Sequence, residues 1–275
     1  MNMKTSNPAY VLGHTDRELS RLKAQARMVE PATRQFFREA GIEAGMRVLD
    51  IGSGAGDVAF LAAEFVGTSG EVIGTDKSAV AVATATRSAQ ERRLHNVSFF
   101  EGDPAELAFD RPFDAVVGRY VLLFQADPAA LVRKVAHHVR PGGVAVFHEP
   151  DWTAARSIPP APTYDRCCGW IQDAFRLSGT DSNMAGRLFK AFVGAGLAAP
   201  TMRMQTFITG GAASADFLQA VADLVGTLVP AMVRLGVVTK SEVARETLAK
   251  QLIEEAAANA GVIVGRSEIG AWTRV

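Results

Sequence analysis

The sequence has little cysteine. Its only two, Cys167 and Cys168, are neighbours in the chain. Adjacent thiols cannot form the framework of cross-links that stabilises small extracellular domains. The 275 residues, 48% of them hydrophobic, are enough to form a large core without disulfides. We therefore expect a cytoplasmic protein whose two cysteines pack in the interior.

The chain also lacks an excess of charge of either sign. Its 29 Lys and Arg residues balance 29 Asp and Glu residues, and no segment carries a block of like charge. Proteins that bind nucleic acids usually present a basic stripe, because phosphate contacts dominate their affinity. The charge balance therefore predicts no nucleic-acid partner.

No apolar run is long and uninterrupted. The most apolar stretch, residues 217–238, contains Asp223, Pro230 and Arg234, and the first residues lack the apolar centre of a signal peptide. A transmembrane helix needs about 20 predominantly apolar residues. We therefore expect a buried helix at 217–238 and no membrane span.

What the sequence does contain is an alternation of strands and helices from residue 46 onwards. The predicted strands are 46–51, 71–75, 97–100, 113–117 and 144–148, and the predicted helices between them are 57–66, 78–93 and 127–139. Strands that alternate with helices of this length indicate a parallel sheet covered on both faces. The fold class is therefore α/β and doubly wound.

Further elements flank this alternation. Two N-terminal helices are expected: one at 15–29, with Thr15 and Glu18 as a capping box, and one from Pro31 to Gly41. After a linker-like run at 158–162, helices are predicted at 163–178, 184–195, 214–236 and 240–259, and strands at 200–209 and 261–275. No linker is long enough to separate two cores. We predict a single domain over 1–275, with N-terminal helices at 1–41, a ligand-binding core at 42–150 and a cap at 151–275.

A glycine loop joins the first strand to the first helix of this core, as Gly52-Ser53-Gly54-Ala55-Gly56 preceded by Asp50. Glycines permit a tight turn and a close ligand approach, and the N-terminus of the helix favours an anionic group. A dinucleotide pyrophosphate calls for another glycine where this chain has Asp57, whose charge would repel it. S-adenosylmethionine (SAM), with one carboxylate and one ammonium, fits the loop better.

Acidic residues follow the next two strands. Asp76, after the second strand, can accept hydrogen bonds from both ribose hydroxyls of a nucleoside; the alternative is an ordinary aspartate at a helix N-terminus. Asp103, after the third strand, can accept from an adenine amino group. Ligands of open parallel sheets bind at the carboxyl ends of the strands. The loop and these two acids together predict a nucleoside site.

In chain order, these motifs resemble those of class I SAM-dependent methyltransferases. The motifs are Asp50-Ile51-Gly52-Ser53-Gly54-Ala55-Gly56, Asp76, Gly102-Asp103, Phe113-Asp114-Ala115-Val116-Val117-Gly118 and Arg140-Pro141-Gly142-Gly143. The resemblance covers residues 40–150 closely and 184–209 loosely, and is nearest to small-molecule enzymes of quinone biosynthesis and natural-product formation. It implies a seven-stranded, mostly parallel sheet with an antiparallel last strand and a helical substrate cap.

The resemblance also implies an activity and a set of contacts. SAM would donate a methyl group to an O, N or C nucleophile of a small molecule, leaving S-adenosylhomocysteine. The implied contacts are the methionine part with Gly52, Gly54, Gly118 and Arg119, the ribose with Asp76, and the adenine with Asp103. Their neighbours Ser53, Lys77, Gly102 and Pro104 complete the predicted cofactor-binding set. Gly118 departs from the pattern, because many relatives have a larger or polar residue there.

His148, at the end of the fifth strand, is the candidate catalytic residue. Methyl transfer needs a general base only if the nucleophile starts protonated, and histidine is easily poised near neutral pH. The alternative is that His148 is a packed residue and that Glu149 orients the cofactor or a loop. His14 is a second candidate. Glu149 and Asp151 have no third acidic partner nearby in the sequence, so we predict no metal.

The predicted helix at 214–236 carries a broad apolar face. Three alternatives fit it: a lid over an apolar or aromatic acceptor, packing in the core, or the interface of a homodimer. Two alternatives to methyl transfer also remain. One is a nicotinamide-dependent oxidoreductase, against which Asp57 and the Arg140–Gly143 turn count. The other is a SAM-binding protein that does not methylate and serves in a cyclisation or as a sensor.

Overall fold

The structure, a computed structural model, describes residues 16–180, 182–239, 241–243, 246–258 and 260–275. The chain divides into two compact units. Unit 1 comprises the residues up to Val29 together with 150–183 and 205–268, and unit 2 comprises 30–149, 184–204 and 269–275. The single-domain organisation over 1–275 stays a prediction.

The strands pair in the order β3-β2-β1-β4-β5-β8-β6, and β7 also pairs with β8. Their bounds are β1 Arg47–Ile51, β2 Glu71–Asp76, β3 Val97–Glu101, β4 Phe113–Arg119, β5 Val139–Asp151, β6 Arg156–Ile158, β7 Thr201–Gly210 and β8 Val262–Arg274. Strands β1 to β5 pair in parallel with one another, whereas β6 is antiparallel to β8. The predicted mostly parallel α/β sheet is confirmed.

Over the described residues the sheet has eight strands, so the expected number of seven is wrong. The unpredicted strand β6 comes just before the linker-like run at 158–162 and shares only Ile158 with it. Its three residues show no apolar alternation. It forms because residues 262–264 of β8 offer it backbone partners, and such pairing is invisible in the local sequence.

The helices agree with the sequence pattern except at their ends. They are α1 Asp16–Ala40, α2 Asp57–Val66, α3 Ala79–Glu91, α4 Pro128–Ala136, α5 Pro162–Leu177, α6 Met184–Gly194, α7 Ala215–Arg234 and α8 Leu248–Ala258, with 3₁₀ turns η1 Leu122–Phe124 and η2 Gly211–Ser214. The helix predicted from residue 240 therefore begins later, at Leu248.

The two expected N-terminal helices are one continuous helix, α1, with Pro31 inside it. A proline has a helical φ angle, and its ring costs one hydrogen bond and some bending rather than the whole helix. Burial of Phe36 and Phe37 in the core of unit 2 offsets that cost. The expected end at Gly41 is confirmed by its φ of +81° and by the Ile42 N–H bond to the Phe37 carbonyl at 2.9 Å. Thr15 and His14 lie outside the described residues.

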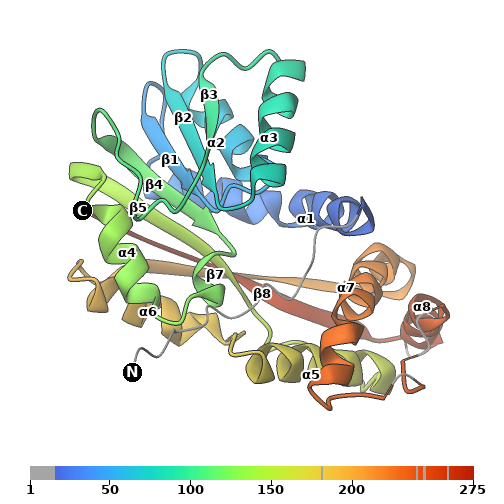
Figure 1. Cartoon of the computed structure of the whole chain (residues 1–275). Helices are drawn as coiled ribbons and strands as arrows, with labels where there is room; N and C mark the ends of the chain where they lie inside the picture. Colours follow the sequence, from blue (N-terminus) through green and yellow to red (C-terminus); the bar gives the residue numbers. More distant parts are fainter. Residues whose placement is uncertain (1–15, 181, 240, 244–245, 259) are drawn as a thin grey trace, which may run out of the picture. The chain divides into compact units, whose positions relative to one another are not determined.

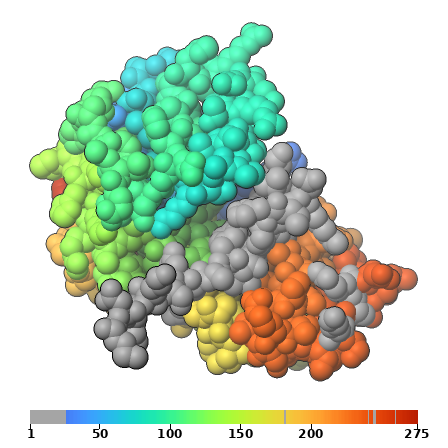
Figure 2. Space-filling model, in the orientation of Figure 1, coloured from blue at the N-terminus to red at the C-terminus, as the bar shows by residue number. Residues whose placement is uncertain are grey.

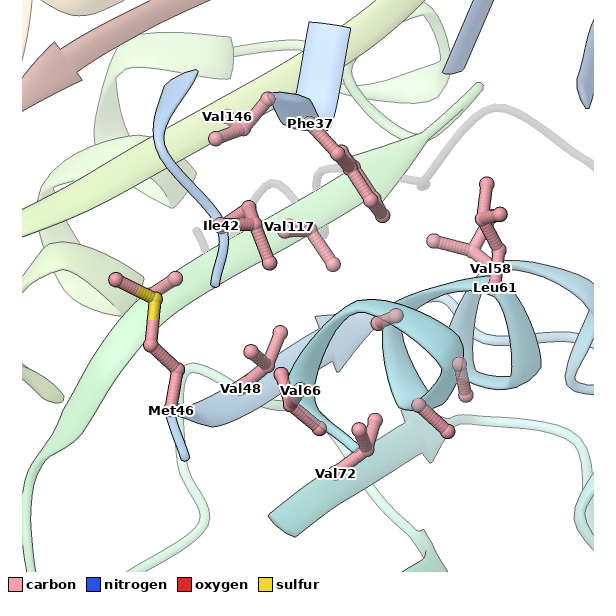
Figure 3. Close-up of a cluster of buried hydrophobic side chains, with 14 of the residues drawn as sticks. Phe37, Ile42, Met46, Val48, Val58, Leu61, Val66, Val72, Val117 and Val146 are labelled. Atoms are coloured by element: carbon pink, nitrogen blue, oxygen red, sulfur yellow. The ribbon is translucent and has the colours of Figure 1, made fainter. Parts of the chain in front are cut away.

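Helices cover both faces of the unit 2 strands, which confirms the doubly wound arrangement. On one face, Val48, Val117 and Val146 pack with Phe37 of α1 and with α2 (Figure 3). On the other face, the Phe147 ring lies 5.8 Å from that of Phe192 in α6, and α6 lies beside α4 (Figure 1). The consecutive residues 146 and 147 point to opposite faces, as strand geometry requires. Helix α3 lies at the surface of unit 2 (Figure 2), with only two of its alanines buried.

In unit 1, helices α5, α7 and α8 pack against one another. The apolar face of α7 that the sequence indicated is buried, which supports the core-packing alternative.

Cys167 and Cys168 are buried as expected, and burial raises the pKa of each thiol to about 12. The segment Gly211–Arg234 is long and apolar enough to cross a membrane by length and composition, but half of its most apolar window is buried. The absence of a membrane span stays a prediction.

Candidate functional site

The carboxyl ends of β1 to β5 form one edge of the unit 2 sheet. The register pairs Ile51 with both Thr75 and Gly118, and Arg119 with His148. Parallel pairing therefore brings together the segments that follow all five strands. Every residue of the predicted cofactor-binding set, and His148, belongs to unit 2 and lies at or just beyond this edge.

Asp76 connects the end of β2 to the glycine loop after β1. Its Oδ2 accepts a hydrogen bond from the Gly54 N–H at 2.9 Å, and its Oδ1 accepts from the Ser78 N–H at 2.8 Å. The second bond comes from Ser78, the N-cap of α3, whose own hydroxyl accepts from the Ala81 N–H, so Asp76 precedes the helix and is not its cap. A carboxylate has about four acceptor positions, so two bonds leave room for further donors.

Asp103 and Lys77 also come together. The Lys77 ammonium lies 2.8 Å from Asp103 Oδ2, and the Ala105 N–H donates to Oδ1 at 3.0 Å. Burial raises the pKa of Asp103, but these two donors outweigh it, so the pKa lies below its ordinary value. The adjacent segment is anchored through the Gly102 N–H, which bonds the Asp76 carbonyl at 2.9 Å, and through the Pro104 carbonyl, 2.9 Å from His138 Nε2.

Asp50, near the end of β1, has a fully buried carboxylate. Neither of its carboxylate oxygens, nor the buried hydroxyl of Ser53, has a hydrogen-bond partner among the described residues. Burial raises the pKa of Asp50 well above its ordinary value, against the lowering effect of Arg119. Nearby, nothing lies within 4 Å of the position that a Cβ on Gly54 would take. In the sequence Asp50 favoured SAM but was not among the predicted cofactor contacts, because its lack of hydrogen bonds follows from burial in the folded chain.

Two glycines of the set are closely approached by side chains. Gly52 has a φ of +63°, and a Cβ on it would lie 2.7 Å from Cγ2 of Val121, so alanine there would clash. A Cβ on Gly118 would lie 3.1 Å from both Ile51 and Phe147, which would have to move by a few tenths of an ångström to accept it. A glycine at position 118 therefore agrees with the close packing around it.

His148 is buried in a network that includes two other side chains. Its Nδ1 lies 3.0 Å from the Thr33 hydroxyl, to which Arg119 donates at 3.2 Å. The rings of Phe36 and Tyr120 meet the imidazole edge-on at 5.0 and 5.5 Å. This environment supports the packing alternative, and the catalytic role of His148 stays a prediction. Sequence reasoning missed Thr33, which lies 115 positions away and belongs to α1.

Glu149 orients the loop after β4, in agreement with the alternative weighed for it. Its Oε1 accepts from the N–H groups of Val121 and Leu122 at 2.9 and 2.7 Å, and Oε2 from that of Leu123 at 3.4 Å. Burial raises its pKa to about 8, although these bonds lower it. Within the ranges that the structure describes, no cluster of three or more His, Cys, Asp or Glu side chains could hold a metal ion.

Comparison with known proteins gives one family match and partial relatives. The profile of a family described as a methyltransferase domain matches residues 42–181. Aklanonic acid methyltransferase DauC of Streptomyces sp. (strain C5) is 38% identical over 111 residues, 40% of this chain and 50% of that protein. The chloroplastic 2-phytyl-1,4-beta-naphthoquinone methyltransferase of Arabidopsis thaliana is 36% identical over 38% of this chain and 41% of its own length. The chain thus spans half or less of the length of these relatives.

A likeness in fold extends over more of the chain. The crystal structure of the YcgJ protein from Bacillus subtilis aligns with a TM-score of 0.57, covering 90% of this chain and 99% of the other, at 20% identity. At that identity the likeness concerns the fold alone. It reaches beyond the part of the chain that the curated relatives match.

Proposed function

The chain belongs to the methyltransferase domain family, and we propose that it transfers a methyl group from SAM to a small-molecule acceptor, with S-adenosylhomocysteine as the product. The observation that carries this proposal is the Asp50 carboxylate, buried without a hydrogen-bond partner in the described chain. A buried carboxylate of this kind is costly unless a cation or a donor approaches it. The ammonium group of SAM is such a partner.

The rest of the edge suits the remaining parts of SAM. The start of α2 offers backbone N–H groups to the carboxylate of the ligand, and the Ser53 hydroxyl is available as a further partner. Asp76 has acceptor positions left for the ribose hydroxyls, and Asp103 for the adenine amino group. When bound, SAM supplies a methyl group already activated by its sulfonium. The protein then has to align the acceptor with that group.

Support for a small-molecule acceptor comes from the relatives, whose names refer to aklanonic acid and to a phytyl naphthoquinone. We propose an apolar or aromatic acceptor and leave its nucleophile open among O, N and C. We also propose a cytoplasmic location and a homodimer. Methyl transfer is favoured over hydride transfer to a nicotinamide because the first turn of α2 carries Asp57, and because both relatives named above are methyltransferases.

The role of His148 depends on the acceptor. If the nucleophile starts as a phenol or an alcohol, a base is useful. We propose comparing His148→Asn with Thr33→Val, which keeps the imidazole and removes its hydroxyl partner. A base role predicts that His148→Asn lowers kcat far more than Thr33→Val, with unchanged affinity for S-adenosylhomocysteine. Equal, small effects on kcat accompanied by lower stability would assign His148 to packing.

Calorimetric titration with SAM, S-adenosylhomocysteine and NAD tests the proposed function. We expect both adenosyl compounds to bind and NAD not to bind. Binding of NAD alone would overturn the cofactor assignment. If SAM binds, phenols, amines and activated carbon acids are then screened for methyl transfer. A tight SAM complex that methylates none of them would favour the alternative of a SAM-binding protein without methyl transfer.

A further inference from the structure

The 3₁₀ turn η1 is held at both ends by hydrogen bonds to side chains. At its start, the Glu149 carboxylate accepts the N–H groups of Val121 and Leu122. At its end, the Arg187 guanidinium donates to the Gln125 carbonyl at 2.6 Å and to the Leu123 carbonyl at 3.4 Å. Glu149 belongs to β5 and Arg187 to α6, so two separate elements of unit 2 hold one short turn.

The arrangement matches the dipole of the turn. Unsatisfied N–H groups gather at the start of a helical turn and unsatisfied carbonyls at its end, so acceptor oxygens at the start and a guanidinium at the end both suit the turn. The bonds that Arg187 donates are charge-assisted and therefore the stronger ones, whereas Glu149, whose pKa burial raises to about 8, contributes its oxygens as acceptors. The Glu149 carboxylate is fully buried and Arg187 half-buried, so water competes little for these bonds. We call Glu149 and Arg187 together the η1 clamp.

The clamped segment supports the glycine loop. Val121, the residue before η1, places Cγ2 at 2.7 Å from where a Cβ on Gly52 would lie. The preceding residue, Tyr120, has a φ of +60°, and its N–H bonds the His148 carbonyl at 2.9 Å. A non-glycine residue at such a φ persists only where its surroundings hold it. The position of Val121 against Gly52 therefore depends on the contacts that fix the segment on either side.

We propose that Glu149 and Arg187 are positioning residues: through η1 they keep Val121 against Gly52 and so preorganise the glycine loop for the adenosyl ligand. This inference rests on the proposed function, because it takes that loop as the SAM site. Both residues act through their bonds to η1, without a contact to the ligand being required. Their effect is on affinity, since a loop that must be ordered on binding lowers it.

The test measures the affinity of the full-length protein for S-adenosylhomocysteine by calorimetry. Arg187→Ala and Glu149→Gln are each expected to weaken binding about tenfold, because the first removes the guanidinium bonds at the end of η1 and the second puts an amide NH₂, which cannot accept, beside the Leu123 N–H. Arg187→Lys should recover part of the affinity that Arg187→Ala loses. The double variant should lose less than the product of the two single losses, because both act on the same turn. Arg133→Ala is the matched control: it removes another guanidinium bond to a carbonyl, that of Gly194, without touching η1.

Unchanged affinity in Arg187→Ala and Glu149→Gln, relative to Arg133→Ala, would overturn the inference. If either variant fails to fold by circular dichroism, Val121→Ala decides the matter. That variant keeps Glu149 and Arg187 and removes the contact with Gly52, and a several-fold weaker affinity is expected. Normal affinity in a folded Val121→Ala protein would also overturn the inference. Failure of the unaltered protein to bind S-adenosylhomocysteine would instead count against the proposed function.

Discussion

The carboxylate of Asp76 accepts a hydrogen bond from the backbone N–H of Gly54 at 2.9 Å. This bond ties the end of β2 to the glycine loop that follows β1. Asp76 thus has two roles in the proposed site: it shapes the loop, and it keeps acceptor positions for a ribose.

Replacing Asp76 by alanine should therefore weaken binding of SAM and S-adenosylhomocysteine more than the loss of a ribose contact alone. We expect at least about a hundredfold, because two or more hydrogen bonds to a charged group are lost. Isothermal titration calorimetry measures the affinity, and circular dichroism checks the fold. Asp110→Ala, an exposed carboxylate that pairs with Arg47, is the control. Near-normal affinity in a folded Asp76→Ala protein would contradict the ribose assignment.

Asp50 should couple SAM binding to proton release. Burial holds its pKa well above the ordinary value in the ligand-free protein. A bound ammonium favours the charged carboxylate and lowers that pKa, so protons leave as the ligand binds. Affinity should then rise with pH until the free protein is itself ionised at Asp50. Calorimetry in buffers of different ionisation enthalpy measures the released protons. Asp50→Asn should bind SAM weakly, with an affinity that does not depend on pH in this way. If the unaltered protein released no protons on binding, that result would argue against an ammonium group at Asp50.

Gly52 and Gly67 offer a contrasting pair of substitutions. Both have a φ of +63°, but only at Gly52 would a Cβ meet an atom within 4 Å. Gly67 combines this φ with a ψ of −170°, a region essentially restricted to glycine, so alanine there costs about 1–3 kcal/mol of backbone strain. Gly52→Ala adds a clash with Val121, and we expect about 1–3 kcal/mol more from overpacking. Chemical denaturation measures both stabilities. S-adenosylhomocysteine affinity should fall only in Gly52→Ala, and equal effects of the two substitutions would refute the close approach.

Glu149 should make stability fall as the solution becomes more alkaline. Its pKa is raised to about 8 by burial, so the folded protein keeps a proton that the unfolded chain loses at its lower ordinary pKa. Folding stability contributed by this group is therefore complete at acidic pH and is lost as the pH rises towards 8. Comparing the unfolding free energy from pH 5 to 9 with that of Glu149→Gln isolates the effect. In Glu149→Gln the unfolding free energy should fall less steeply with pH. Parallel curves for the two proteins would exclude a contribution of Glu149 to the pH dependence.

Most of the fold and the backbone of the site could be predicted from the sequence, because the relevant signals are local. Apolar strands, helix caps such as Ser78 and Asp127, and the glycine loop each act over a few residues. The same local signals were misleading at Pro31, where burial of the following phenylalanines keeps α1 continuous. They were silent at β6, which depends on a partner strand more than 100 residues further along the chain.

Local sequence signals are enough to place the α/β alternation, the glycine loop and the acids after β2 and β3, which are the residues that point to an adenosyl ligand. Three relationships emerge from the folded chain alone: the Asp50 carboxylate is buried without a hydrogen bond to the described residues, His148 contacts Thr33, and Glu149 and Arg187 bond the two ends of η1. These relationships join distant parts of the chain. They depend on strand order, register and burial, and those arise only when the whole sheet and its helices pack together.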